Sequence, residues 1–210
     1  MISLPRLYAI LDASCFSNSE GLLKTAEELL AAGVTLLQYR NKTGDARAML
    51  TQALELHQRS RVGSPAPHIA KLIMNDRADL CLGAEFDGVH VGRDDLLPES
   101  AREIVGNERC LGVSTHNPQQ VAEADGTSAD YIAVGPVFAT ASKLNPDPVI
   151  GLAGVRKSRQ LTRKPLVAIG GITRGNCRAV IEAGADSVAV ISDLIRDPSK
   201  SAEEFLRILG

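Results

Sequence analysis

Leu166-Val167-Ala168-Ile169-Gly170-Gly171-Ile172-Thr173 is the stretch of sequence that decides the fold. Its first four residues are apolar, and a short, continuous apolar run is typical of a strand that is buried on both faces. The glycine pair that follows permits a tight turn because no Cβ interferes. Seven further apolar runs end in the same way, in polar residues or glycine. The complete set spans residues 7–12, 36–41, 72–76, 89–92, 111–116, 131–137, 166–171 and 188–192.

A helix-compatible segment separates each of these runs from the next. In residues 20–32, for example, leucines and alanines fall on one face of a predicted helix and charged residues on the other. Eight strand–helix units in succession predict an α/β fold, the (β/α)8 or TIM barrel. We interpret residues 1–210 as a single TIM-barrel domain. In such barrels the carboxyl ends of the strands meet at one mouth, where the chemistry takes place, whereas the turns before the strands lie at the opposite mouth and serve stability.

The composition narrows the class of protein. The chain has 23 basic and 25 acidic residues and a net charge of −2, with no basic block interleaved with aromatic residues, which argues against nucleic acid as a partner. No segment approaches the roughly 18 apolar residues of a membrane span, and the first six residues lack a secretory pattern, so we expect no membrane and a cytoplasmic protein. The four cysteines form no metal-binding motif, and we expect them to be reduced and packed as small apolar groups.

Two turns at the predicted mouth fit a phosphate group. Gly170-Gly171 follows the seventh run, and Ile191-Ser192-Asp193 ends the eighth. Loops after strands seven and eight form the common phosphate site of these barrels, through backbone N–H groups and a short helix N-terminus. Taken alone, a glycine pair would be only a tight turn, and its position in the barrel is what favours phosphate binding.

Two carboxylates, Asp76 and Asp95, end neighbouring runs three and four. Adjacent parallel strands lie about 5 Å apart, so the two side chains could share one ion. Magnesium prefers hard oxygen ligands and often takes one or two carboxylates, with water and substrate phosphate completing its shell. The alternative for an aspartate at a strand end is that it caps the following helix, and we favour that role for Asp94. Asn75 could bind substrate without competing for the metal.

Cations gather at the same mouth. Arg40 and Lys42 alternate at the end of the second run and therefore project to the same side as Gln38. The long segment 139–151 after the sixth run is a candidate lid that carries Lys143 and two hydroxyl side chains. Three cations and a metal suit a diphosphate. The alternative for Arg40 and Lys42 is a solvated surface pair.

Two histidines need a weighed interpretation. His116 lies just past the fifth run, where Asn117-Pro118 begins a predicted helix. A structural hydrogen bond at that helix start and a catalytic role are both open for His116, and the sequence assigns it no carboxylate partner. His90 lies within the fourth run and could face either the barrel or the helices.

Seven motifs occur in order over nearly the whole chain. They are Gln38-x-Arg40-x-Lys42, Asn75-Asp76-Arg77, Gly88-Val89-His90-Val91-Gly92-x-Asp94-Asp95, Gly112-Val113-Ser114-x-His116, Gly135-Pro136-Val137-Phe138-x-Thr140-x-Ser142-Lys143, Ala168-Ile169-Gly170-Gly171-Ile172 and Val190-Ile191-Ser192. Together they resemble the thiamine phosphate synthase family. The resemblance implies a transferase of thiamine biosynthesis that joins 4-amino-2-methyl-5-hydroxymethylpyrimidine diphosphate to 4-methyl-5-(2-phosphoethyl)thiazole and releases pyrophosphate.

The resemblance also implies a role for each matching residue. Asp76 and Asp95 would hold Mg2+, and Gln38 would lie against the pyrimidine. The residues that would contact the diphosphate are Arg40, Lys42, Asn75, Ser114 and Lys143. All of them except Asn75 would also be catalytic groups. The residues that would hold the thiazole phosphate are Thr140, Ser142, Gly171, Ile191 and Ser192. The implied mechanism is dissociative: the diphosphate leaves first, a pyrimidine carbocation forms, and the thiazole nitrogen captures it without a general base.

The sequence departs from the usual family pattern at three positions. Arg93 replaces a common Gln and Ser142 a common Thr. Arg93 can point outward, and Ser142 keeps a hydroxyl. Ile150 replaces another common Gln and removes a polar group near the base of the candidate lid. We therefore expect Ile150 to act on lid closure or substrate affinity and to leave the metal site unchanged.

Two other functions compete with the synthase. The related thiazole tautomerase has the same barrel and phosphate site and uses a histidine near His116 for proton transfer. It needs no diphosphate or metal site, so the retained cations and aspartates favour the synthase. A catalytically silent barrel that binds a thiazole or thiamine phosphate as a regulator would be free to lose the metal ligands. Small barrels are often homo-oligomers, and the sequence leaves the oligomeric state open.

Overall fold

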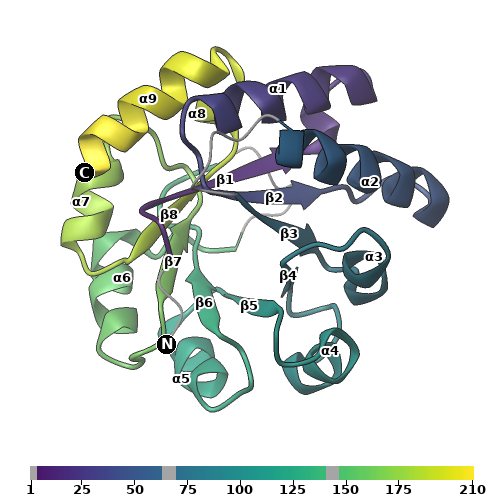
Figure 1. The fold of residues 1–210 in the computed structure, drawn as a ribbon. Coiled ribbons are helices and arrows are strands. Elements are labelled where there is room, and N and C mark those ends of the chain that lie inside the picture. The colour runs from purple at the N-terminus through teal and green to yellow at the C-terminus, as the bar shows by residue number, and fades with distance from the viewer. Residues whose placement is uncertain (1–3, 63–69, 141–146) are drawn as a thin grey trace.

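The computed structural model describes residues 4–62, 70–140 and 147–210 and confirms the predicted fold. Eight parallel strands form a closed barrel in the order β1 to β8, and helices surround it (Figure 1). The strands are β1 (Leu7–Asp12), β2 (Leu36–Arg40), β3 (Lys71–Asn75), β4 (Gly88–Val91), β5 (Cys110–Thr115), β6 (Tyr131–Val134), β7 (Leu166–Ile169) and β8 (Ser187–Val190).

The helices are α1 (Ser19–Ala31), α2 (Ala46–Val62), α3 (Ala78–Gly83), α4 (Pro98–Val105), α5 (Pro118–Asp125), α6 (Gly151–Arg159), α7 (Cys177–Glu182), α8 (Ser192–Ile195) and α9 (Pro198–Leu209), with a 3-10 turn η1 (Ala13–Cys15) after β1. Helices α1 to α7 connect consecutive strands on the outside of the barrel, and α8 and α9 follow β8. The short helix α8 follows β8 directly and precedes α9, the arrangement in which many TIM barrels bind phosphate.

Seven of the eight strands contribute to two apolar cores, because successive side chains of a strand point to opposite faces, and β4 contributes apolar residues to the outer core alone. In β1, Leu7 and Leu11 pack between the sheet and the helices, whereas Tyr8 and Ile10 point into the barrel. Both faces are buried, which explains why the sequence shows continuous apolar runs and not an alternating pattern. The inner core consists of Tyr8, Ile10, Leu36, Ile73, Cys110, Tyr131, Ala133, Val167 and Ala189.

Aspartates in the turns before three strands tie the amino end of the barrel together. Asp87, Asp130 and Asp186 each accept a hydrogen bond, at 2.7–2.8 Å, from a backbone N–H near the start of the preceding strand. Arg102 also donates to Asp130 and Arg159 to Asp186, each at 2.6 Å. These contacts join neighbouring strands, as a role in stability requires.

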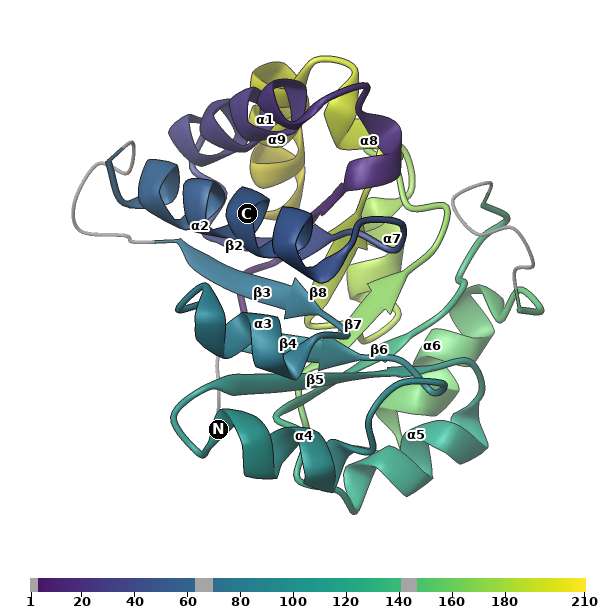
Figure 2. The same cartoon turned by 90° about the vertical axis from the view of Figure 1, so that its right-hand side faces the viewer.

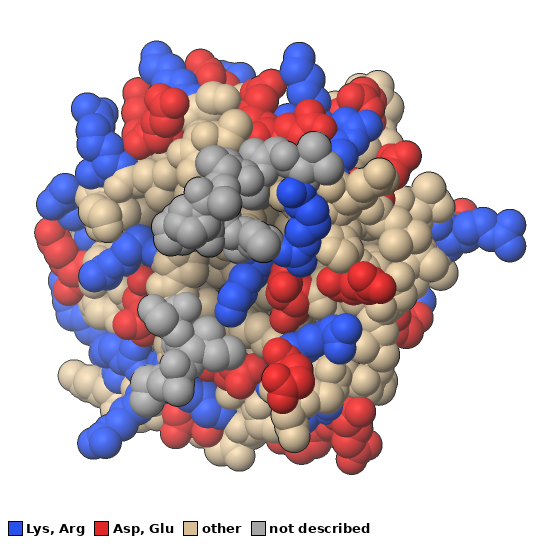
Figure 3. Space-filling model, in the orientation of Figure 1, with Lys and Arg blue, Asp and Glu red and all other residues tan. Residues whose placement is uncertain are grey.

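The carboxyl ends of the strands define the opposite mouth. In Figure 2 the arrowhead of β3 points to the right of the view, and because all strands are parallel their carboxyl ends share that side. On the face drawn in Figure 3, basic and acidic side chains are interspersed, and neither sign of charge forms a continuous field there.

Two further expectations concern membranes and cysteines. Within the described residues, no helix combines the length and the apolar character needed to cross a membrane. All four cysteines are free thiols. Cys81, Cys110 and Cys177 are buried, as expected, but Cys15 is exposed, so the prediction of a packed thiol is wrong for Cys15. The reason is that Cys15 ends the η1 turn at the surface and is not part of a strand or helix face.

Candidate active site

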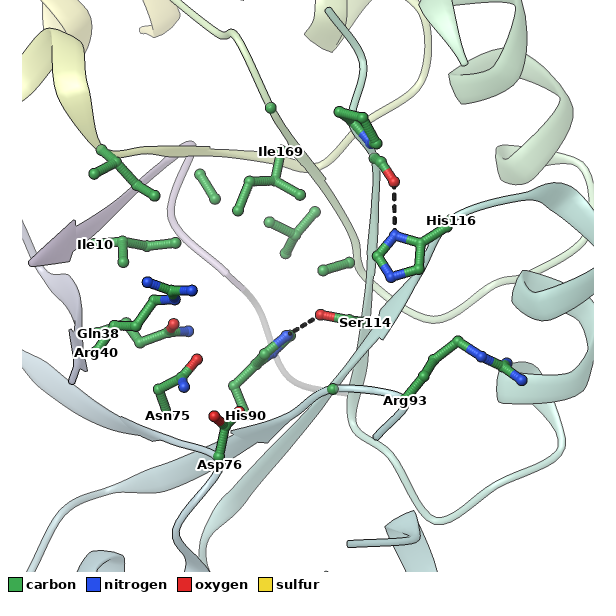
Figure 4. A pocket seen from close by; sticks show the side chains of 18 of the residues that line it. Ile10, Gln38, Arg40, Asn75, Asp76, His90, Arg93, Ser114, His116 and Ile169 are labelled. Atoms are coloured by element: carbon green, nitrogen blue, oxygen red, sulfur yellow. Dashed lines mark hydrogen bonds between the residues drawn. The ribbon is translucent and has the colours of Figure 1, made fainter. Parts of the chain in front are cut away.

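A cavity opens at the carboxyl mouth, and side chains from every strand of the barrel line it. Its apolar lining includes Ile10, Val167 and Ile169, and polar side chains cover the remainder (Figure 4). The predicted site residues that line it are Gln38, Arg40, Lys42, Asn75, Asp76, Asp95, Ser114, Thr140 and Ile191. Gly171 and Ser192 follow β7 and β8 at the same mouth without lining the cavity. Ser142 and Lys143 lie outside the described residues.

The two predicted metal ligands are close enough to interact. Burial raises the pKa of Asp76, and a hydrogen bond between the carboxyl groups of Asp76 and Asp95 acts in the same direction. The Lys42 ammonium, with Nζ 2.7 Å from Asp76 Oδ2, opposes that rise in the pKa. Asp95 also accepts a hydrogen bond from the backbone N–H of Gly92 at 2.9 Å. Two carboxylates in contact repel each other when both are charged, and a divalent cation removes that repulsion.

The backbone at Asp76 is strained. Its φ of 62° lies in the left-handed region, which costs a non-glycine residue free energy and often marks functional sites. A hydrogen bond of 2.7 Å from the Asp76 N–H to the carbonyl of His90 holds this conformation. Asp76 does not cap the helix that follows, since α3 has Arg77 at its N-cap and no side-chain cap.

Asp94 does not cap a helix, and that prediction is wrong. Helix α4 begins at Pro98 with Leu97 at its N-cap, and no side chain caps it. Asp94 lies too far before the helix, and its side chain is exposed. Proline at the first position of α4 needs no cap there because it has no N–H to satisfy.

The donor set fits magnesium. Within residues 4–62, 70–140 and 147–210, no group of three or more histidine, cysteine, aspartate or glutamate side chains could enclose a metal ion. A pair of carboxylates without soft or imidazole ligands is the partial shell that Mg2+ uses when water and substrate phosphate supply the remaining oxygens. Asp76 and Asp95 therefore fit a metal that binds together with a phosphorylated substrate.

Arg40, which ends β2, and Lys42, which follows it, both lie beside carboxylates. Arg40 forms an ion pair with Asp12, which is 3% exposed, because the β1–β2 register sets these residues opposite each other. Lys42 pairs with Asp76. The alternative of a solvated surface pair is wrong for Arg40, whose side chain is only 24% exposed. Sequence reasoning missed Asp12, since pairing between β1 and β2 cannot be read from residues 28 positions apart.

A buried polar chain crosses the cavity below these charges, and it too was missed. His90 faces the barrel interior, where its Nε2 lies 2.8 Å from Ser114 Oγ (Figure 4). Its Nδ1 lies 3.0 Å from the Tyr131 hydroxyl. Burial lowers the pKa of His90 to about 4, so the ring is neutral near pH 7. Gln38 Nε2 donates to the Tyr8 hydroxyl at 2.7 Å. The sequence offered one signal for this chain: Tyr8 and Ile10 alternate with outward-facing residues of β1, which indicates that the Tyr8 side chain lies inside the barrel.

Asn75 presents a donor without a partner. Its side chain is 6% exposed and lines the cavity, and its Nδ2 makes no hydrogen bond with any described residue. A buried unpaired amide nitrogen costs free energy unless a ligand supplies an acceptor. Phosphate oxygen is an acceptor, so this orphaned donor fits a phosphorylated substrate.

His116 supports the loop after β6. Its Nδ1 lies 2.9 Å from the carbonyl oxygen of Gly135, and Figure 4 shows this contact at the edge of the cavity. The carboxylate of Asp147 lies 3.5 Å from the same nitrogen, so His116 has an acidic neighbour that the sequence did not assign. The helix start itself is capped by Asn117, whose side chain accepts from Gln120 N–H at 3.0 Å.

The glycine pair after β7 is required by the backbone. Gly170 and Gly171 have φ values of 99° and 63°, which favour glycine. A Cβ on Gly171 would lie 2.4 Å from the carbonyl oxygen of Ala139, so the turn packs directly against the loop after β6. The interpretation of Gly170-Gly171 as a tight turn is therefore confirmed, and the role of this turn in phosphate binding stays a prediction.

Of two departures from the family pattern, Arg93 lies among the residues that line the cavity and Ile150 does not. The guanidinium of Arg93 points outward toward α5, where its Nη1 lies 3.8 Å from Glu123 Oε2 (Figure 4). Ile150 packs against the outer core at the N-cap of α6 and does not line the cavity. The missing glutamine therefore costs the cavity no polar group at this position.

A TIM barrel with a carboxylate pair, cations and a glycine turn at its carboxyl mouth belongs to the class of barrel enzymes that act on phosphorylated substrates. The family model described as thiamine monophosphate synthase matches residues 7–194, and the chain belongs to this family. The thiamine-phosphate synthase of Koribacter versatilis is 58% identical over 99% of this chain and 97% of that protein. The one of Chloroflexus aurantiacus is 42% identical, over 97% and 92%.

A solved structure agrees with these relatives. Thiamine phosphate pyrophosphorylase from Pyrococcus furiosus superposes with a TM-score of 0.84 and 33% identity, over 97% of this chain and 95% of that chain. The similarity thus covers the fold and the sequence together. The family resemblance drawn from the seven motifs is confirmed.

Proposed function

We propose that the carboxyl mouth of this barrel joins 4-amino-2-methyl-5-hydroxymethylpyrimidine diphosphate to 4-methyl-5-(2-phosphoethyl)thiazole, giving thiamine phosphate and pyrophosphate. Membership of the family makes the chain a transferase of thiamine biosynthesis that acts on small molecules. The observation that carries the proposal for this site is the contact of Asp76 with both Asp95 and Lys42 in a cavity that Arg40 also lines. Two acids and two cations around one space suit a metal-bound diphosphate.

The diphosphate would take over contacts that the side chains now make with each other. Lys42 lies on Asp76 and Arg40 on Asp12. A divalent cation would replace Lys42 as the partner of Asp76, so Lys42 could turn to the diphosphate without leaving that carboxylate unpaired. Arg40 has five N–H donors and could keep its ion pair with Asp12 while it also donates to the diphosphate. Asn75 Nδ2 and the Ser114 hydroxyl would donate to its oxygens. Lys143 stays a prediction for the same group.

Departure of the diphosphate is the step these residues favour. Mg2+ held by Asp76 and Asp95 would supply Lewis-acid stabilisation of the negative charge on the leaving group. Arg40 and Lys42 would add fixed positive charge where that charge develops. The apolar lining from Ile10, Val167 and Ile169 would keep water from the carbocation before the thiazole nitrogen captures it. No residue has to remove a proton in this sequence of events.

The thiazole phosphate would bind at the turns after β7 and β8. Gly171 and the start of α8 offer backbone N–H groups, and Ile191 lines the adjacent cavity wall. Thr140, on the loop against which Gly171 packs, lines the same cavity. The roles of Gly171, Ser192 and Ser142 stay predictions, as do a cytoplasmic location and a homo-oligomeric state.

The direct test supplies the purified chain with both substrates and Mg2+ and follows thiamine phosphate by chromatography. We expect product only when the pyrimidine diphosphate and the thiazole phosphate are both present. Tight binding of either compound by folded protein without product would favour the silent regulator.

The tautomerase alternative gains one observation, the 3.5 Å approach of Asp147 to His116. An acidic neighbour is what a proton-transferring histidine needs. Because the His116 ring also bonds the Gly135 carbonyl, we assign it a structural role. We therefore expect His116→Ala to reduce kcat/KM for thiamine phosphate formation by less than about fivefold, measured under steady-state conditions. A loss of a hundredfold or more, the scale of general acid–base catalysis, would support the tautomerase.

A further inference from the structure

Five buried or half-buried side chains form one continuous hydrogen-bond chain across the floor of the cavity. Gln38 Nε2 lies 2.7 Å from the Tyr8 hydroxyl, which lies 3.0 Å from the Tyr131 hydroxyl. Tyr131 lies 3.0 Å from His90 Nδ1, and His90 Nε2 lies 2.8 Å from Ser114 Oγ. The two ends of the chain, Gln38 and Ser114, line the cavity from β2 and β5, on different sides of the barrel. The direction of the hydrogen bond at Gln38 is therefore linked to the direction of the hydrogen bond at Ser114.

The direction of the chain follows from the group that starts it. The Gln38 amide nitrogen can only donate, so the Tyr8 oxygen accepts. Burial raises the pKa of both tyrosines, so both hydroxyls keep their protons. The proton of Tyr8 then points to Tyr131, and that of Tyr131 points to His90 Nδ1. A neutral imidazole that accepts at Nδ1 carries its hydrogen on Nε2 and donates to Ser114.

If the hydrogen bonds between Tyr8 and Ser114 ran in the opposite direction, the hydroxyl proton of Tyr8 would have no acceptor in the described part of the chain. If Tyr131 donated to Tyr8, the Tyr8 oxygen would accept from both Gln38 and Tyr131. Its own proton would then have no acceptor among the described residues, because the Tyr8 hydroxyl bonds to these two side chains alone. Tyr8 is 1% exposed, and an unsatisfied buried donor is costly. Only the first direction gives the Tyr8, Tyr131 and His90 hydrogens an acceptor each among the described residues.

We propose that this hydrogen-bond chain gives the cavity floor a fixed polarity, with the Ser114 hydroxyl as donor at one end and the Gln38 side-chain oxygen as acceptor at the other. The chain thereby couples recognition of an anion at Ser114 to recognition of an amino group at Gln38. The inference rests on the proposed function and deepens it. Phosphate oxygens accept, so the anionic end of the substrate demands a donor at Ser114. The same direction obliges Gln38 to accept, and the exocyclic amino group of the aminopyrimidine is the donor that matches it.

Because of this coupling, a carbonyl group on the pyrimidine ring would weaken the binding of the substrate. A substrate that carries an oxo group in place of the 4-amino group would set an acceptor against the Gln38 oxygen. Gln38 could turn its amide only if Tyr8 donated to it, which would reverse every bond in the chain and make Ser114 an acceptor facing the diphosphate. Tyr8, Tyr131 and His90 thus act on substrate specificity as positioning residues, through Gln38 and Ser114.

The polarity can be read without turnover from the 15N NMR signals of the histidine rings. The His90 signal is assigned as the one that disappears in His90→Gln. We expect His90 in the free protein to carry its hydrogen on Nε2. A hydrogen on Nδ1 would overturn the inference whether or not the chain makes thiamine phosphate. Absence of product with both substrates would count against the proposed function and leave this reading of the polarity intact.

Substitution of Tyr131 by Phe tests the coupling. Tyr8 would lose its acceptor and could satisfy its proton only by donating to Gln38, whose amide nitrogen would then face the cavity. In the wild type we expect kcat/KM for the 4-amino diphosphate to exceed that for the 4-oxo analogue by about a thousandfold, since sites that bond a polar group reject its mismatch strongly. In Tyr131→Phe we expect this ratio to fall below about tenfold, mainly through KM.

Tyr39→Phe is the matched control. Tyr39 is as fully buried as Tyr131, but its hydroxyl bonds to Gln52 of α2 at 2.6 Å, outside the barrel. We expect its substrate ratio to stay within about threefold of the wild type. A wild-type ratio preserved in folded Tyr131→Phe, or an equal fall in Tyr39→Phe, would refute the coupling. The NMR experiment decides the polarity if Tyr131→Phe does not fold.

Discussion

Asp95→Asn is expected to lower kcat for thiamine phosphate formation by roughly a thousandfold, because metal stabilisation of a leaving group is worth several kcal/mol. The reason lies in the paired carboxylates. Asn keeps an oxygen for the hydrogen bond from Gly92 N–H but removes the charge that, with Asp76, would hold the cation. Isothermal titration with the thiazole phosphate should give the wild-type Kd, because the predicted thiazole phosphate site lies at β7 and β8.

Asp94→Asn is the matched control for this variant. Asp94 is the adjacent residue at the exposed rim of the same cavity, and it makes no hydrogen bond or ion pair with the part of the chain that the structure describes. We expect its kcat to stay within about threefold of the wild type. Equal losses of turnover and of thiazole phosphate binding in Asp95→Asn would mean that Asp95 supports the fold and not the metal.

Gly171→Ala is expected to raise KM for the thiazole phosphate and to lower kcat, with a combined loss in kcat/KM of about a hundredfold. The new Cβ would lie 2.4 Å from the carbonyl oxygen of Ala139, and φ is already 63°, so the turn or the loop after β6 has to move. Shifts of about 1 Å in a positioned group can cost two orders of magnitude in rate. Steady-state kinetics with the pyrimidine diphosphate held saturating would measure the effect.

Gly175→Ala controls for the loss of a glycine in the same loop. The nearest atom to its added Cβ would be Thr173 Oγ1 at 3.7 Å, an ordinary contact, and the position is exposed. We expect nearly wild-type kinetics. If Gly171→Ala instead binds thiazole phosphate normally, the glycine pair serves only as a tight turn, and the phosphate site must lie elsewhere in the mouth.

The fold could be predicted because each strand carries its own signal. A strand buried on both faces needs only apolar residues within a short window, so residues 166–169 and 188–191 identify themselves without knowledge of their neighbours. The common mouth then follows from parallel topology. Asn75, Asp76 and Ser114 could be assigned to the cavity for this reason alone: they sit at the carboxyl ends of strands.

Contacts between strands could not be predicted, because they depend on register. The pairing of Arg40 with Asp12 and the chain from Gln38 to Ser114 join residues that are far apart in sequence and meet only once the barrel closes. Tyr8 and Tyr131 looked like ordinary core residues, and only their hydroxyl partners reveal another use. The Asp94 cap failed for a local reason, since α4 begins three residues later than a cap at Asp94 would require.

We propose that this mouth releases pyrophosphate from a metal-bound diphosphate when the thiazole phosphate is present. The most direct measurement follows pyrophosphate release by the purified chain with both substrates, over a series of Mg2+ concentrations and again after a chelator is added. We expect release that requires both substrates, saturates with Mg2+ and stops with the chelator. Release that continues unchanged without the metal, or no release from folded protein at any Mg2+ concentration, would contradict it.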